Sequence, residues 1–490
     1  MVGITAYGGY VPRLRLARKA IVEANSWFNP GIARLNKGER SMCNWDEDSL
    51  TMAVEAARDC LGGSVPDGLQ ALTLASTTLP FEDRQNASIV ATALNLGEAL
   101  TTMDVTASQR AATSGLVNAF HALAGHGGAS LFIGAEKRRA KAAGTQELLF
   151  GDGAAALLLG SDGIVAEFLG SHQVTVDFVD HYRGKDDTYD YNWEERWIRD
   201  EGYGKIVPRT LEGLFSKTGI AAGDIDRFVM PSVMGAVPGR IAKQVGIDAD
   251  AVHTTLHAEM GESGAAHPLV LLIHALEQAE PGQTILVIGW GQGCDALLFK
   301  ATDALKKLSP RRGIVGSLAR RRVVTNYNKY LAFNDLVLRD KGLRAEMDRQ
   351  TALSSLYRKR EMITGFVGGK CRTCGTVQFP KTEACVSPNC GEFHSQDDHP
   401  FADIPATVQS WTADNLTYSP DPPHHFGMIV FEEGGRMMAD LTDIDVGTLE
   451  VGAPLRMVFR IKEVDEQRGF TKYFWKGAPE TAPDPATDED

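Results

Sequence analysis

The sequence lacks the features that mark membrane, secreted and nucleic-acid-binding proteins. Its 490 residues contain no apolar run close to the roughly 20 residues that a membrane-spanning helix needs. Residues 1–16 carry Tyr, Pro and Arg where the apolar core of a signal peptide would lie. Basic residues are in the minority, 50 Lys and Arg against 63 Asp and Glu, and the net charge of −13 disfavours nucleic acids and anionic membranes as partners. We therefore expect a cytoplasmic protein with no nucleic-acid partner and no membrane partner.

Cysteine is scarce as well, and its distribution is uneven. Of the seven cysteines, Cys43, Cys60 and Cys294 are scattered through the first 300 residues, whereas four lie between residues 371 and 390. A few thiols gathered in one short stretch are typical of a metal site in a reducing compartment. The pattern argues against a framework of disulfides.

The sequence does contain the patterning of a globular α/β protein. Its apolar content of 43% and charged content of 23% are ordinary, and its length allows two to four domains. Buried strands alternate with helices through the first 300 residues, which predicts mixed α/β layers. The strand that follows Gly151-Asp152-Gly153 is mirrored by a second one after Gly289, so we expect an internal duplication with halves at 1–165 and 166–302.

The composition changes after Lys300. Residues 303–364 are basic with a helical pattern, which predicts a connector whose basic face is solvated or docks on a domain, with contact to a phosphorylated ligand as the lesser alternative. Residues 365–400 hold the cysteine cluster. Residues 401–478 alternate as short strands separated by turn residues, which predicts a small β-barrel of the OB type. Residues 479–490 are rich in Pro and acidic residues, which predicts a disordered acidic tail.

Two short-spaced cysteine pairs give the strongest local signal in the chain. The pairs are Cys371 with Cys374 and Cys385 with Cys390. Two such pairs can close a tetrahedral zinc site, and four protein ligands leave no open position, so the predicted zinc is structural. The longer spacing of the second pair leaves His394 as a substitute ligand, and four unrelated thiols remain the alternative interpretation.

Residues 103–116 turn from a short apolar strand into a helix of small residues. A turn of this kind presents Gln109, or Ser108 beside it, at the start of a buried helix. Unpaired backbone N–H groups and the helix dipole at such a start favour an anion or a polarised carbonyl. The alternative is a small-residue helix that packs in a core and has no chemical role.

Several of these stretches resemble the thiolase superfamily. The first 300 residues are most similar to the hydroxymethylglutaryl-CoA (HMG-CoA) synthases and more distantly to ketoacyl-ACP synthase III; the matching segments are 7–12, 52–57, 109–115, 151–153 and 289–293. The last third resembles the OB-fold/zinc-ribbon domains that accompany acyl-CoA thiolases, with matches at residues 374–380 and 473–476. The resemblance implies a duplicated thiolase-like αβαβα fold and a coenzyme A thioester as substrate. It also implies a homodimer paired across the edge strand at residues 103–105, and a possible partner enzyme that delivers the thioester.

The departures from this resemblance bear directly on the chemistry. In the HMG-CoA synthases a nucleophilic cysteine precedes a Lys-Ala-Gly/Ala-Thr run, and here Gln109 precedes Arg110-Ala111-Ala112-Thr113. The family's glutamate acid/base position is occupied by Thr77, and its His-Gln-Pro-Asn run becomes Pro231-Ser232-Val233-Met234. Three replaced positions indicate that Gln109 is the native residue, because a knockout of the nucleophile would change only one.

A glutamine cannot form an acyl-enzyme, but its amide can hydrogen-bond a carbonyl oxygen. Proton transfer must then come from other groups, and the stretch between His253 and Pro268 offers His257, Glu262 and His267 as catalytic candidates. The resemblance places this stretch over the active-site cleft. A helix start would lower the pKa of His267 and favour a neutral base, although each histidine can equally be a structural one. The remaining candidates, expected to bind substrate, are Ser108, Arg110, Thr77, Gly291 and Gly293.

These observations predict an enzyme that makes or breaks a carbon–carbon bond in an acyl-CoA without an acyl-cysteine. Retro-aldol cleavage of a β-hydroxyacyl-CoA is the leading hypothesis, because it needs a base and enolate stabilisation but no covalent intermediate. One alternative is an acyltransferase of the HMG-CoA synthase or ketoacyl synthase type that uses a relocated nucleophile, Cys294 or Ser108. The other is a non-catalytic scaffold that binds acyl-CoA and passes it between partner enzymes.

Overall fold

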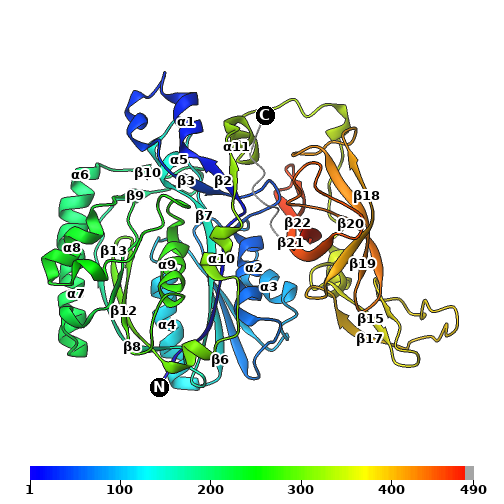
Figure 1. Cartoon of the computed structure of the whole chain (residues 1–490), viewed down its shortest axis with the longest axis horizontal. Helices are drawn as coiled ribbons and strands as arrows, with labels where there is room; N and C mark the ends of the chain where they lie inside the picture. The colour runs from blue at the N-terminus through cyan, green and yellow to red at the C-terminus, as the bar shows by residue number, and fades with distance from the viewer. Residues whose placement is uncertain (481–490) are drawn as a thin grey trace. The chain divides into compact units, whose positions relative to one another are not determined.

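The computed structural model describes residues 1–480, so residues 481–490 of the predicted acidic tail lie outside the described residues. The chain divides into two compact units (Figure 1). Unit 1 comprises residues 1–44, 48–88 and 98–336. Unit 2 comprises residues 45–47, 89–97 and those from 337 onward.

Unit 1 is built on a sheet of nine strands in the order β11-β12-β13-β8-β1-β7-β6-β4-β5. The strands are β1 (Gly3–Tyr10), β4 (Leu69–Ala75), β5 (Thr101–Val105), β6 (Ala129–Lys137), β7 (Asp152–Gly160), β8 (Ala166–Thr175), β11 (Arg227–Val229), β12 (Thr284–Trp290) and β13 (Gly293–Ala301). The two halves of the sheet meet at only two residue pairs between β1 and β8, Gly3 with Glu167 and Ile4 with Ala166.

The pairing directions show the internal duplication. In the first half β1 is antiparallel to β7, β7 is antiparallel to β6, and β6 is parallel to β4. In the second half β8, β13, β12 and β11 repeat these directions in the same order. The parallel edge strand β5 of the first half corresponds to a single parallel bridge between Phe228 and Val252 in the second. The expectation of two similar halves is therefore confirmed by topology.

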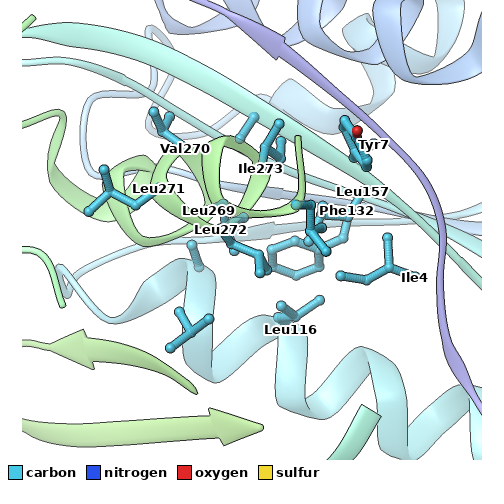
Figure 2. Packing of buried hydrophobic residues seen from close by; sticks show 14 of the residues in the cluster. Ile4, Tyr7, Leu116, Phe132, Leu157, Leu269, Val270, Leu271, Leu272 and Ile273 are labelled. Atoms are coloured by element: carbon cyan, nitrogen blue, oxygen red, sulfur yellow. The ribbon is translucent and has the colours of Figure 1, made fainter. Parts of the chain in front are cut away.

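Helices complete five layers. Two central helices, α4 (Ala111–His126) and α9 (His267–Leu276), contact each other and strands of both halves. Helix α2 (Ser49–Leu61) covers the other face of β1, β6 and β7, and α7 (Gly204–Thr218) does the same for β8 and β13. All ten residues of α9 are buried, as expected for a helix that is apolar on every side. Figure 2 shows Leu269 and Leu272 of α9 beside Leu116 of α4 and Phe132 of β6.

Shorter elements surround this core. A three-stranded sheet is formed by β14 (Arg322–Val324), β2 (Leu14–Ala17) and β3 (Glu39–Met42), and a small hairpin by β9 (His181–Tyr182) and β10 (Tyr191–Asn192). The remaining α-helices up to residue 336 are α1 (Arg18–Asn25), α3 (Asn86–Ala93), α5 (Thr145–Leu149), α6 (Glu195–Trp197), α8 (Val237–Val245), α10 (Gly313–Ala319) and α11 (Tyr327–Phe333).

Unit 2 contains a ribbon and a barrel. The ribbon strands are β15 (Val367–Cys371), β16 (Val377–Gln378) and β17 (Gln396–Pro400), and the short helices α12 (Leu353–Arg358) and α13 (Arg360–Ile363) precede them. Five strands follow in the order β20-β19-β18-β21-β22, namely β18 (Ala406–Asp414), β19 (His424–Phe431), β20 (Arg436–Asp440), β21 (Pro454–Asp465) and β22 (Phe470–Pro479). A parallel bridge between Leu441 and Gly477 joins the end of β20 to β22 and closes the barrel. The predicted ribbon and OB-type barrel are thus present.

Unit 2 also takes in residues from the first hundred. Asp46, from the segment Trp45–Glu47, is fully buried, and its carboxylate accepts from Lys476 Nζ at 2.8 Å. Arg460, also fully buried, lies 3.0 Å from Glu47 Oε1. Buried charges need partners, so these N-terminal carboxylates are part of the structure of unit 2.

The stretch predicted as a helical connector, residues 303–364, holds four short α-helices separated by irregular chain, and its first part to residue 336 belongs to unit 1. Within the described part of the chain, no helix is both long enough and apolar enough to cross a membrane.

Candidate active site

A tight turn joins β5 to α4 and places Gln109 at the start of the helix. Ala107 in this turn has a φ of 70°, in the left-handed region that residues other than glycine seldom adopt. Gly291, at the end of β12, packs directly against the turn, because a Cβ added there would lie 3.2 Å from the Gln109 backbone nitrogen and 3.0 Å from Ser108 Oγ. Gly291, predicted to bind substrate, therefore allows a close approach of two backbone segments, and its substrate-binding role stays a prediction.

The neighbours of Gln109 are tied to the protein. The backbone N–H groups of Arg110 and Ala111 donate to Ser108 Oγ at 3.1 Å and to Ser108 O at 2.9 Å. Arg110 donates to Asp295 Oδ1 at 2.8 Å and, through Nε, to Gly291 O at 2.8 Å. Arg110 therefore links the start of α4 to Asp295 on β13, and its side chain is not part of the lining of the hollows at this turn. Two of the N–H groups expected to hold a substrate anion are already used by Ser108.

Gln109 itself is linked to a buried carboxyl group through Thr77. Gln109 Nε2 lies 3.4 Å from Thr77 Oγ1, and Thr77 Oγ1 lies 3.2 Å from Glu136 Oε2. Thr78 Oγ1 donates to the same carboxyl oxygen at 3.0 Å. Burial raises the pKa of Glu136 to about 7, against which the hydrogen bonds from Thr77 and Thr78 act. A carboxyl group therefore lies behind Thr77, the residue at the family's glutamate position.

Two hollows meet at this turn. The larger, about 490 Å³, has mixed walls: apolar and aromatic side chains such as Ile198, Met234 and Trp290 alternate with polar and charged ones such as Arg138 and Glu262. The smaller, about 400 Å³, is lined by Thr77, residues 106–109, Arg183 and Gln292, among others. Gln109 and His181 line both, so these two side chains stand where the hollows adjoin. Cavities of this size hold drug-sized ligands.

Of the predicted catalytic groups besides Gln109, Glu262 reaches the larger hollow. Its carboxylate is not free, because Glu262 Oε2 lies 2.5 Å from Arg138 NH1. Arg138 is also paired with Asp190 at 3.1 Å and stacks over the Phe150 ring at 3.6 Å. This buried charge cluster forms one wall of the hollow.

The two predicted histidines line neither hollow. His267 is fully buried at the start of α9, with Nε2 3.0 Å from Thr255 O and Nδ1 3.1 Å from Ser263 Oγ. Both ring nitrogens are thus engaged, and burial lowers the pKa of His267. Burial lowers the pKa of His257 to about 4, and no hydrogen-bond partner for its Nε2 is found among residues 1–480. Tertiary packing, rather than any sequence signal, holds both residues away from Gln109.

The two residues suspected as relocated nucleophiles, Cys294 and Ser108, lie in different surroundings. Cys294 is fully buried in the cluster that covers the outer side of β12 and β13, and burial raises the pKa of its thiol to about 12. Ser108 lines the smaller hollow, but its hydroxyl is used by Arg110 N and by Gly291 O at 3.3 Å. Pro231, at the family's histidine position, and Ser232 beside it line the larger hollow. Gly293 has a φ of 123°, and a Cβ there would meet Val174 O at 2.2 Å, so its role is close packing.

A histidine paired with an aspartate is a further candidate group that the sequence pattern did not indicate. His181 Nδ1 lies 2.9 Å from Asp180 Oδ1, and Asp180 Oδ2 accepts from Trp290 Nε1 at 2.7 Å. The two residues lie in a polar and aromatic stretch without helical or strand periodicity, between β8 and β10. Their only sequence signal is a His next to an Asp, which is too common to indicate a site.

The four clustered cysteines of unit 2 converge as the spacing predicted. Their sulfur atoms all lie within 4.8 Å of one another, with Cys371 and Cys390 3.9 Å apart and Cys374 and Cys385 3.5 Å apart. Four thiolates at Zn–S distances of 2.3 Å around a tetrahedral ion lie about 3.8 Å from one another. The donor set therefore fits a four-thiolate zinc site, and His394 is not needed as a ligand.

Family profiles match three parts of the chain. Residues 215–300 match the C-terminal part of 3-oxoacyl-[acyl-carrier-protein] synthase III. Residues 365–394 match the rubredoxin-like zinc ribbon domain of ChsH2, and residues 400–460 match the C-terminal OB-fold domain of ChsH2.

Relatives that align over most of their own length decide the family. The hydroxymethylglutaryl-CoA synthase of Aeropyrum pernix is 30% identical over 335 residues, which are 67% of this chain and 92% of that protein. The chain belongs to the hydroxymethylglutaryl-CoA synthase family. The HMG-CoA synthases of Caldivirga maquilingensis and Archaeoglobus fulgidus, 26% and 29% identical, match 69% and 68% of this chain over 98% of their own lengths. The resemblance seen in the sequence is confirmed.

Solved structures agree on the fold. A crystal structure of HMG-CoA synthase complexed with CoA aligns with a TM-score of 0.60 at 15% identity, covering 82% of this chain and all of that one. MvaS in complex with 3-hydroxy-3-methylglutaryl coenzyme A aligns with a TM-score of 0.57 at 19% identity, covering 69% and 92%. The predicted thiolase-like fold, with its appended zinc ribbon and barrel, is therefore confirmed for this member of the HMG-CoA synthase family.

Proposed function

We propose that this protein cleaves the Cα–Cβ bond of a β-hydroxyacyl-CoA by a retro-aldol reaction, without an acyl-enzyme. One observation carries the proposal: the side chain at the start of α4 that lines both hollows is the amide of Gln109, and the lining residues, all within residues 1–480, include no cysteine. An amide cannot attack a thioester, so the covalent route of a thiol enzyme is not available at this turn. The substrate class is supported by two solved relatives, described as complexes with CoA and with 3-hydroxy-3-methylglutaryl coenzyme A, itself a β-hydroxyacyl thioester.

The amide of Gln109 has the hydrogen-bonding capacity that such a substrate needs. Its Oε1 is buried and has no hydrogen-bond partner within the described chain, and one of its two N–H bonds points to Thr77. A buried acceptor without a partner is costly, so it calls for a donor from a ligand. The second N–H of Nε2 is left for the thioester oxygen of the substrate. Charge develops on that oxygen when the enolate forms, and a preorganised donor stabilises it.

The covalent alternative is less well supported. Cys294 is fully buried and lines neither hollow, and a thiol with a pKa of about 12 holds almost no thiolate at neutral pH. Ser108 has no histidine or carboxylate among the described residues within hydrogen-bonding distance of its hydroxyl. Neither group has the activated character that nucleophilic catalysis needs.

Incubation of the purified protein with a panel of β-hydroxyacyl-CoAs tests the proposal. Mass spectrometry should detect a shortened acyl-CoA together with a free aldehyde or ketone, and Gln109→Ala should reduce their formation. Gln70→Ala is the matched control, because Gln70 is an exposed amide on β4 that lines neither hollow. A stable acyl adduct on Ser108 or Cys294 in intact-mass spectra would establish the acyltransferase alternative. Thioester binding with neither cleavage nor adduct would establish the scaffold.

We further propose that the four ribbon cysteines hold one structural zinc ion. The sulfur–sulfur distances suit a tetrahedral site, and four protein ligands leave no position open for substrate. When bound, the ion links the two ends of the ribbon loop and stabilises unit 2. Elemental analysis of protein without an affinity tag should find about one zinc per chain.

The expected homodimer and partner enzyme also remain proposals. Strand β5 ends the nine-stranded sheet, so one edge of it is open for pairing, and Met103 on this strand is 45% exposed. A second copy paired along β5 would bury both the open edge of this strand and the Met103 side chain. Light scattering at micromolar concentration should report a dimer, and a monodisperse monomer would exclude this pairing.

A further inference from the structure

The Asp180–His181 pair has the geometry of an oriented acid–base group. Asp180 is held from three directions: its Oδ1 accepts from the backbone N–H of His181 at 2.8 Å and lies 2.9 Å from His181 Nδ1, and its Oδ2 accepts from Trp290 Nε1 at 2.7 Å. Asp180 and Trp290 are both buried. A carboxylate fixed in this way keeps the proton of a neutral imidazole on Nδ1 and leaves Nε2 as the acceptor.

His181 also stands where chemistry at Gln109 would occur. The two side chains are the only residues that line both hollows within the described chain. The His181 side chain is 19% exposed, so it is reachable from the hollows without being a surface group. Because Nδ1 is committed to Asp180, Nε2 is the ring nitrogen available to a ligand.

The charges around the ring favour a basic imidazole. Burial alone would lower the pKa of His181, but the hydrogen bond to Asp180 and its negative charge more than offset this and raise that pKa above its ordinary value. Of the other charged groups nearby, Arg138 lowers the pKa and Asp190 raises it. Conversely, burial would raise the pKa of Asp180, and the His181 and Trp290 contacts lower it, so Asp180 stays ionised.

We infer that His181 is the catalytic acid–base of this site, and that Asp180 and Trp290 are positioning residues that orient its ring. The inference rests on the proposed retro-aldol function. His181 Nε2 takes the proton of the β-hydroxyl, the O–H electron pair forms the new C=O bond at Cβ, and the Cα–Cβ bond breaks. Its electron pair passes to the thioester enolate. The imidazolium then returns the proton to Cα, which gives a shortened acyl-CoA and a free carbonyl compound with no net change in protons.

The other titratable groups of the hollows are less suited to this step. Glu262 and Asp190 are each paired with the buried Arg138, at 2.5 Å and 3.1 Å, so their carboxylates are already engaged. Glu136 contacts Thr77 and Thr78 and lines neither hollow. His181 combines a place beside Gln109 with a ring nitrogen that is free to exchange a proton.

Two reactions separate the role of His181 from the overall function. The first is cleavage of 3-hydroxyhexanoyl-CoA and its homologues. The second is exchange of the α-hydrogens of acetyl-CoA and propionyl-CoA in D2O. This exchange needs the same base and the same enolate, but it breaks no carbon–carbon bond. His181→Gln should lose about 10²–10⁴-fold in both while retaining acetyl-CoA binding in calorimetry. His121→Gln, on the exposed side of α4, is the matched control and should leave both rates unchanged.

The titration of His181 tests the positioning role of Asp180 and Trp290. Asp180→Asn removes the charge that raises the pKa of His181, so the histidine titration followed by NMR in the free protein should move to lower pH. The rising limb of the exchange rate against pH should move with it. Trp290→Phe keeps an aromatic ring but removes the N–H donor, and we expect a smaller shift in the same direction.

The outcomes are distinguishable. Exchange that depends on His181, without cleavage of any thioester tested, would retain His181 as the base and overturn the retro-aldol proposal. Cleavage that persists in His181→Gln within twofold of the wild type would overturn the inference and retain the proposed function. An unchanged histidine titration in Asp180→Asn would remove Asp180 from the mechanism, and absence of both reactions in the wild type would overturn both.

Discussion

In unit 1 the cysteines are packed where they can do little chemistry, whereas in unit 2 four cysteines converge on one point. Cys60 and Cys294 are fully enclosed, and burial raises the pKa of each thiol to about 12. The ribbon cysteines instead surround a space that fits a metal ion. Cysteine is thus absent from the family's nucleophile position, which Gln109 occupies, and is concentrated in the ribbon, where the chain needs a cross-link.

The two units also handle charge differently. The walls of the hollows in unit 1 combine Arg138 with carboxylates and leave amide and imidazole groups for a ligand. Unit 2 buries Asp46, Glu47, Arg460 and Lys476 as mutually paired charges. The first arrangement suits catalysis, because a site needs groups whose partners are still to come, and the second suits structure.

Removal of one ribbon thiolate should have the largest effect on stability. Cys385→Ser leaves three thiolates, and because structural zinc in small domains supplies on the order of 10 kcal/mol of folding free energy, the ribbon should unfold. Elemental analysis should show lost zinc, and hydrogen exchange should show lost protection in β15–β17. Cys60→Ala is the control and should retain about one zinc per chain. A wild type without zinc, with all four ribbon thiols rapidly alkylated, would contradict the prediction.

Breaking the buried charge network should destabilise unit 2 next most strongly. Asp46→Asn removes the carboxylate paired with the buried Lys476, whereas Arg460 keeps its other carboxylate partners, and the change should cost about 3–5 kcal/mol. Urea unfolding followed by hydrogen exchange in β21 and β22 measures this loss. Asp397→Asn breaks an exposed pair with Arg372, and we expect a change of no more than about 1 kcal/mol there. Equal effects of the two changes would mean that the N-terminal segment contributes no more than a surface pair.

Replacement of the amide at the start of α4 should affect rate rather than stability. Gln109→Ala removes the donor that faces the thioester oxygen, and we expect a loss of about tenfold to a thousandfold in kcat/KM. Thermal unfolding should change little, because Gln109 makes only one long hydrogen bond, to Thr77. A loss of stability without a loss of rate would assign Gln109 a structural role instead.

Glu136 and Asp440 should give the two units opposite responses to pH. Burial raises the pKa of Glu136 from 4.5 to about 7 in the folded chain. Between these two pH values the folded chain therefore keeps the proton of Glu136, whereas the unfolded chain releases it. Its contribution is therefore complete below pH 4.5 and is lost as pH rises through 7, by up to about 3 kcal/mol. Burial would raise the pKa of Asp440, but His424 and Lys462 lower it, so its contribution is lost as pH falls. The free energy of unfolding of Glu136→Gln, measured from pH 5 to 8, should decrease less than that of the wild type.

Alkylation of thiols in unit 1 should have the smallest effect. Brief treatment of native protein with iodoacetamide should leave Cys43, Cys60 and Cys294 unmodified, because all three are buried. Turnover should then persist, since no thiol takes part. Rapid inactivation that tracks modification of Cys294 would bring back the relocated nucleophile. Peptide mass spectrometry identifies the modified residue.

Much of the architecture was predictable because its causes are local. The apolar runs that became β12 and α9, the glycine turns at Gly151 and Gly291, and the two cysteine pairs each carry their signal within a few residues. The β-barrel was visible as short alternating strands. The insertion of Trp45–Glu47 into unit 2 was not predictable, because nothing in three residues near the N-terminus specifies a partner such as Arg460 more than 400 residues away.

One kind of chemistry is excluded by the amino-acid sequence alone. Gln109 at the nucleophile position excludes an acyl-cysteine there whatever the fold does around it, because an amide has no nucleophilic form near neutral pH. Only the tertiary structure decided which side chains accompany Gln109. His257 and His267 belong to the stretch expected over the cleft, but packing and hydrogen bonds keep them out of the lining of both hollows. His181 reaches the hollows from a segment with no periodic pattern. The physical reason is that orientation and burial of a side chain depend on contacts with Asp180, Trp290 and the central helices, which are made only when both halves of unit 1 have folded.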